Sequence, residues 1–178
     1  MLRKITLLRH AMPEVDASSA PSSWRLSADG AAAAAALLLE GAAVSSPELK
    51  ALQTTALATR VLPEAVAQDA RFREVDRDEP VHDDFRDARR AWVSGSLDER
   101  HSGWETQDAV SQRFHDGLMA HSAEHLVVGT HGMALTAWMT AQGLIEPGDA
   151  AVEFWAALRF PEVIELDLPL SPRGAPRR

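Results

Sequence analysis

The sequence predicts an α/β domain in which helices cover both faces of a mainly parallel central sheet, a three-layer α/β/α sandwich. Two short segments predict strands buried on both faces: residues 2–9, which are mostly apolar in their second half, and the apolar run at 126–129. Segments with helical spacing separate the strand-like segments, an alternation that favours parallel strands. A length of 178 residues suffices for one substantial core. We therefore expect a single domain over residues 1–170, followed by a disordered basic tail over 171–178.

The N-terminal part begins with the strand predicted over residues 2–9. A loop rich in proline, serine and alanine follows over 11–26, and a loop of this length is often functional. Ser27 has the character of a helix N-cap, with Asp29 in the first turn. The alanine-rich helix that begins there is expected to end at Gly41.

The next segments predict two more strands on either side of a helix. Residues 42–45 form a brief apolar strand, and residues 49–62 form a helix that stops before Pro63. A third strand is expected within residues 66–72.

The second half of the chain predicts three helices, at residues 83–93, 105–121 and 133–142. The last of them is ended by Gly143 and follows the buried strand at 126–129. Beyond it, residues 152–158 and 163–168 are rich in β-branched and aromatic side chains, so both are predicted to be β-segments.

The composition restricts the classes of function. Apolar residues make up 46% and charged residues 25%, as in ordinary soluble proteins. With no cysteine, disulfides, thiolate catalysis and thiolate metal sites are excluded, and we expect a cytoplasmic protein. A net charge of −8 argues against nucleic acid and anionic membranes as partners, so an anionic ligand must be attracted by a local positive cluster. The sequence carries no signal of oligomeric state.

Two predicted strands end in histidine. Arg9 and His10 close the first strand, and a cation beside an imidazole suits capture of an anion followed by nucleophilic attack on it. His131 and Gly132 follow the strand at 126–129 and lead into a helix whose N-terminus favours anions. Parallel strands bring both histidines to one edge of the sheet, where ligands bind in open α/β folds.

Several segments resemble, in their order, those of the histidine phosphatase superfamily, also called phosphoglycerate mutase-like. Residues 8–11 (LRHA) match its N-terminal Arg-His-Gly with alanine in place of glycine, and residues 46–54 (SPELKALQT) match its Ser-Pro-x-x-Arg-Ala-x-Gln-Thr segment. The late His-Gly is at residues 131–132, and weaker matches are at 26–30, 69–75 and 103–106. Together they cover roughly residues 2–143.

The resemblance implies a two-step phosphoryl transfer that needs neither a metal nor a cofactor, and no His/Asp cluster has metal-binding spacing. His10 attacks phosphorus and forms a phosphohistidine that water later hydrolyses, Arg9 holds phosphate oxygens, and His131 donates a hydrogen bond. Glu74 is placed as the acid that protonates the leaving oxygen and then activates water, provided that its surroundings raise its pKa. Neighbouring acids remain open for this role: Asp76, Asp78, Glu79 and Asp83.

One position departs from the family pattern. Lys50 stands where the family has its second arginine, and lysine keeps the charge but lacks the planar two-pronged grip on an oxyanion. Either Lys50 contacts phosphate with weaker orientation, or it points elsewhere and Arg25 or another loop cation substitutes for it.

The expected activity is hydrolysis of a phosphomonoester, on either a small molecule or a protein phosphohistidine. One alternative is a phosphate-binding or regulatory protein with weak or no turnover, which Lys50 and the alanine after His10 both favour. A second is a phosphoglycerate mutase-type phosphotransferase. Hydrolysis is preferred to it because the chain is short and lacks the insertions of the larger mutases.

Overall fold

A five-stranded sheet forms the centre of the domain in the computed structural model, which describes residues 2–77 and 85–169. The strand order is β3-β2-β4-β1-β5. The first four strands in this order run parallel, and β5 pairs antiparallel with β1 at the sheet edge. The bounds are β1 (Leu2–Arg9), β2 (Ala42–Ser45), β3 (Ala67–Gln68), β4 (His125–Thr130) and β5 (Glu162–Pro169). The prediction of a mainly parallel sheet is confirmed.

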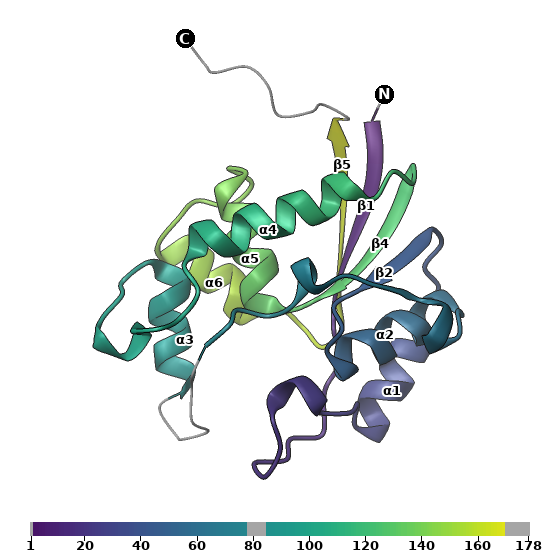
Figure 1. Ribbon diagram of the computed structural model, residues 1–178, viewed down its shortest axis with the longest axis horizontal. Coiled ribbons are helices and arrows are strands. Elements are labelled where there is room, and N and C mark those ends of the chain that lie inside the picture. Colours follow the sequence, from purple (N-terminus) through teal and green to yellow (C-terminus); the bar gives the residue numbers. More distant parts are fainter. Residues whose placement is uncertain (1, 78–84, 170–178) are drawn as a thin grey trace.

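Helices cover both faces of this sheet, which confirms the predicted three layers. In Figure 1, α1 and α2 lie on one side of the strands, and α3, α4, α5 and α6 lie on the other. Their bounds are α1 (Ala28–Ala35), α2 (Leu49–Thr59), α3 (Phe85–Ser94), α4 (Gln107–Ala120), α5 (Gly132–Ala141) and α6 (Asp149–Ala157).

The two faces of the sheet carry cores of different character. Alternation along the strands sends Leu7 and Val128 to the four-helix side, where they join a large cluster that contains Trp138. Leu8 and Val127 point the other way and form a smaller cluster with Ala58 of α2, against which Leu37, Leu39 and Val163 pack. The sheet is buried on both faces, as its apolar strands predicted.

The prediction that residues 152–158 form a β-segment is wrong, because they lie in and just after α6. Ala151 and Val152 are buried where α6 packs on its neighbours α5 and α3. Asp149 sits in the first turn, where its charge complements the helix dipole. Tertiary packing here overrides the β-propensity of the valine and the aromatic residues.

Three predicted elements are shorter than expected. Helix α1 ends at Ala35 rather than at Gly41, since the leucines that follow leave the helix to cover the sheet, and Leu39 N donates to Ala58 O at 2.9 Å. Helix α2 ends at Thr59, with Arg60 in the left-handed region at φ 59°. Strand β3 spans two residues, because the Asp69 side chain accepts from Arg71 N and begins a short 3-10 turn.

Some expectations concern segments outside the described residues. The basic tail over 171–178 lies there, as do three of the alternative acids: Asp78, Glu79 and Asp83. Within the described part, no helix combines the length and the apolarity that spanning a bilayer requires.

Candidate active site

The carboxyl ends of β1, β2 and β4 bring the predicted site residues together. Arg9 pairs with Thr130 across the parallel strands, and His10 N donates to Thr130 O at 3.0 Å. On the other side of β4, Ser46 N donates to Gly129 O at 2.8 Å. The imidazole rings of His10 and His131 then lie 5.2 Å apart, centre to centre.

The His10 ring is held in one tautomer. Its Nδ1 lies 2.8 Å from the carbonyl oxygen of Ala11, and a carbonyl can only accept, so Nδ1 carries the proton and Nε2 the lone pair. The residue is only 7% exposed. Burial, then the charges of His131 and Lys50, hold the pKa of His10 well below its usual range. His10 is therefore a neutral imidazole with a nucleophilic nitrogen opposite its hydrogen bond.

Helix α2 fixes the backbone that orients His10. The hydroxyl of Thr54 accepts from Ala11 N at 2.9 Å and donates to Lys50 O at 2.7 Å. The carbonyl that selects the His10 tautomer therefore belongs to a residue anchored to α2.

His131 is fully buried and faces carboxylates. Its Nε2 lies 2.8 Å from Ser46 Oγ and 3.3 Å from Glu48 Oε1, while its Nδ1 has no hydrogen-bond partner among the described residues. Burial lowers the pKa of His131, and the carboxylates of Glu48 and Glu74 oppose that effect by stabilising the protonated ring. The surroundings thus favour His131 as a hydrogen-bond donor.

Arg9 is held by the segment that joins α6 to β5. Its Nη1 donates to Leu158 O at 2.6 Å, and its guanidinium lies 3.5 Å from the ring centre of Phe160, which also packs against His10. A Cβ on Gly132 would come within 3.2 Å of Arg9 Nε, so a glycine at the start of α5 leaves room for this side chain. Burial lowers the pKa of Arg9 to about 10, so it stays charged at neutral pH.

Glu74 caps helix α5. Its carboxylate accepts from Ala134 N at 2.9 Å, Val75 N at 3.0 Å and Met133 N at 3.3 Å. Burial alone would raise the pKa of Glu74, but His131, Arg77 and the Val75 N–H lower it overall. The condition set for Glu74 as a proton donor, a raised pKa, is therefore not met, and without ligand the group is a carboxylate.

Arg113 holds the segment that carries Glu74. Its guanidinium pairs with Glu105 at 2.7 Å and donates to the carbonyl oxygens of Arg71, Arg73 and Glu74 at 2.6, 2.9 and 3.1 Å. This arginine from α4 thereby fixes the backbone on which the Glu74 carboxylate is mounted.

Lys50 is paired with Glu48, a carboxylate that no sequence motif marked as a site residue. Its Nζ lies 2.6 Å from Glu48 Oε2 and donates to Pro21 O at 2.7 Å. Burial alone would raise the pKa of Glu48, yet His131 and Lys50 bring it down to about 2. The only sequence signal for Glu48 was its place in the turn between β2 and α2, two residues before Lys50.

Within the described residues, no hydrogen bond or ion pair joins the remaining predicted candidates to His10 or His131. Arg25 is exposed, and no hydrogen bond or ion pair in the described residues joins its side chain to this cluster. Asp76 is exposed and lies 3.7 Å from Arg73. Among residues 2–77 and 85–169, no group of three or more histidine, aspartate or glutamate side chains could hold a metal ion.

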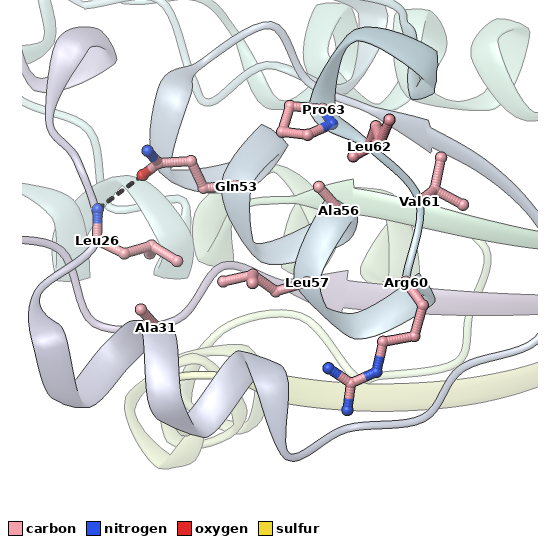
Figure 2. A pocket seen from close by; sticks show the side chains of 9 residues that line it. All are labelled: Leu26, Ala31, Gln53, Ala56, Leu57, Arg60, Val61, Leu62 and Pro63. Carbon is pink, nitrogen blue, oxygen red and sulfur yellow. Dashed lines mark hydrogen bonds between the residues drawn. The ribbon is translucent and has the colours of Figure 1, made fainter.

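A separate hollow of about 490 Å³ opens between α1 and α2. Figure 2 shows its mostly apolar lining, with Gln53 hydrogen-bonded to the backbone of Leu26. None of the predicted site residues lines it, and it offers few groups for acid–base or nucleophilic chemistry. The polar cluster at the strand ends is therefore the better candidate site.

Comparisons with known proteins agree with this fold. Residues 5–151 match the histidine phosphatase superfamily (branch 1). Mycobacterial glucosyl-3-phosphoglycerate phosphatase has a similar fold, with a TM-score of 0.62 at 22% identity over 94% of this chain and 91% of that one. Its complex with inorganic phosphate gives 0.57 at 24% identity over 86% and 83%.

A phosphoglycerate mutase from Bacillus anthracis gives a TM-score of 0.65 at 12% identity, over 93% of this chain and 88% of that one. No curated protein matches the sequence. Because the family match spans most of the residues and includes both strand-end histidines, this chain belongs to the histidine phosphatase superfamily.

Proposed function

We propose that this protein hydrolyses phosphomonoesters through a phosphohistidine formed on His10. The observation that carries the proposal is the hydrogen bond from His10 Nδ1 to the Ala11 carbonyl, which leaves the Nε2 lone pair free for attack. A nucleophilic imidazole must be neutral, and its buried position beside other cations keeps it so.

In the first step, His10 Nε2 forms a bond to phosphorus while the bond from phosphorus to the leaving oxygen breaks. Arg9 and His131 stabilise the charge on the phosphoryl oxygens as this bond breaks. The leaving oxygen takes a proton from Glu74. Glu74 is ionised before the ligand arrives, but a phosphoryl dianion beside it raises its pKa and favours uptake of the proton that it then donates.

In the second step, water attacks phosphorus and the bond to His10 Nε2 breaks. Glu74, now a carboxylate, accepts the proton that the attacking water loses. The three backbone N–H groups that bind Glu74 hold it in one orientation for both steps. Inorganic phosphate and a neutral His10 are left at the end of the cycle.

The substrate is a phosphorylated small molecule or a protein phosphohistidine. Support for a small phosphoester comes from the related folds, one of which is a glucosyl-3-phosphoglycerate phosphatase. We favour the small molecule for this reason, and place the phosphoprotein second.

The test is hydrolysis of p-nitrophenyl phosphate by the wild type and by His10→Ala between about pH 5 and 8. We expect turnover by the wild type alone, with an acid-labile phosphate adduct trapped on His10 after rapid quenching. An active His10→Ala protein, or an adduct on another residue, would refute this mechanism.

A second function, phosphate binding with little or no turnover, is favoured by one specific observation. Lys50 donates to Glu48 and to the Pro21 carbonyl, so the cation at this position is already paired within the chain. Phosphate binding by a wild-type protein that forms no adduct and hydrolyses no phosphoester would favour this second function over the first.

A further inference from the structure

Glu48 is the first residue of the turn that opens α2, yet its side chain does not cap that helix. It occupies the N-cap position of α2 without a side-chain capping hydrogen bond. The carboxylate turns instead toward the active site, where Oε2 meets Lys50 Nζ at 2.6 Å and Oε1 lies 3.3 Å from His131 Nε2. An acidic side chain thus lies against two of the groups assigned to phosphate.

The position of Glu48 is closely determined. Its Oε1 also accepts from Glu74 N at 2.8 Å, and its side chain is only 13% exposed. Groups from three parts of the chain therefore surround the carboxylate: Lys50 of α2 and the backbone N–H of Glu74 donate to it, and His131 Nε2 after β4 lies 3.3 Å away. A phosphoryl oxygen would seek the same kind of donors at this edge of the sheet.

From these contacts we infer that Glu48 is an internal anion that competes with phosphate for Lys50 and His131. The carboxylate neutralises local positive charge in a protein whose net charge is already −8. A phosphorylated ligand must therefore displace the carboxylate from Lys50 or bind against its repulsion. This inference rests on the proposed function only in taking phosphate as the ligand.

The alternative is that Glu48 is a structural link between α2 and the Glu74 segment. The two hypotheses predict opposite changes in anion affinity when the Glu48 carboxylate is removed. A structural link predicts that removing the carboxylate disorders the site and weakens anion binding. A competing anion predicts that removing it strengthens anion binding, because Lys50 is released.

The experiment measures the Kd of inorganic phosphate by titration calorimetry at pH 7, with Glu48→Gln and Glu48→Leu compared with the wild type. We expect both variants to bind phosphate roughly tenfold more tightly or better, since a buried like charge is removed from the site. Thermal unfolding checks that each variant is folded, and the leucine variant serves if the glutamine variant is unstable. Unchanged or weaker binding by a folded variant overturns the inference.

Two further variants show whether the increase in phosphate affinity arises from the release of Lys50. Glu40→Gln changes the net charge equally at an exposed position before β2, at the opposite end of the strand from the site, and is expected to leave the Kd unchanged. Adding Lys50→Met to Glu48→Gln should remove most of the increase in phosphate affinity, because the released lysine is then absent. A gain that persists in this double variant, or that Glu40→Gln reproduces, contradicts competition for Lys50.

The measurement does not depend on turnover. If the wild type hydrolyses no phosphoester and yet Glu48→Gln binds phosphate more tightly, the proposed function fails and this inference stands. If turnover is found but Kd does not respond to Glu48, the inference fails and the proposed function stands.

Discussion

The two strand-end histidines have similar positions in the fold but different electrostatic environments: cations surround His10, whereas carboxylates lie close to His131. Both follow parallel strands, both are buried, and their rings are 5.2 Å apart. His10 donates to a neutral carbonyl and lies among cations, whereas His131 lies 3.3 Å from one carboxylate and close to a second. In the proposed mechanism, this difference in neighbours, more than their places in the fold, makes His10 the nucleophile and His131 the hydrogen-bond donor.

Loss of the nucleophile should have the largest effect. His10→Ala should lower kcat at least about 10³-fold, because in the proposed mechanism His10 is the group that accepts the phosphoryl group. Steady-state hydrolysis and acid-labile adduct formation check this, with thermal unfolding as the folding control. Residual turnover within tenfold of the wild type would remove His10 from its role.

Loss of the donor should slow the reaction without preventing the adduct. His131→Asn should lower kcat about 10²- to 10³-fold, the usual cost of removing one donor to a developing negative charge. Rapid quenching should still trap phosphate on His10, more slowly. His121→Asn is the matched control, since it removes a histidine that pairs with Asp69 outside the site and should leave kcat unchanged. An absent adduct in a folded His131→Asn protein would show that the two rings do not have separate roles.

The two histidines should also make the protein less stable in acid. A lowered pKa in the folded state means that, below the unfolded value near 6.5, the unfolded chain binds protons that the native protein does not. The free energy of unfolding should therefore fall as the pH drops from about 7 to 5, by up to about 1.4 kcal/mol per pH unit for each histidine.

Urea unfolding at several pH values measures this slope. His10→Asn should flatten it more than His131→Asn does, because the cations around His10 add to burial, whereas the carboxylates around His131 oppose it. An equal or reversed order would mean that neighbouring charges do not distinguish the two rings.

The smallest effect is expected at the hydroxyl beside His131. Ser46→Ala removes the oxygen 2.8 Å from His131 Nε2, but Glu48 Oε1 remains as an acceptor, so kcat should fall only about three- to tenfold. Ser45→Ala is the control, since the equally buried Ser45 hydroxyl donates to the Ser46 carbonyl instead. A similar loss in both variants would point to general disturbance of the turn after β2.

Much of the fold could be predicted because the sequence patterns were local. Apolar runs marked β1 and β2 with the observed bounds, and Ser27 began α1 as its N-cap. Residues 152–158 were mistaken for a strand, because their helical state depends on packing against α5 and α3. The end of α1 likewise depended on a contact with a distant segment, Leu39 N to Ala58 O, whereas β3 was cut short by a local turn that Asp69 begins.

The sequence by itself determined which groups are available: two histidines at strand ends, an arginine beside one of them, and a lysine where the family has an arginine. Only the tertiary structure decided which charged groups lie next to each of them, and therefore how their pKa values are shifted. Glu48 is two residues from Lys50 in the chain but 83 from His131, and only the parallel sheet brings its carboxylate to both. Charge interactions depend on distance in space and on burial, and neither can be read from sequence separation.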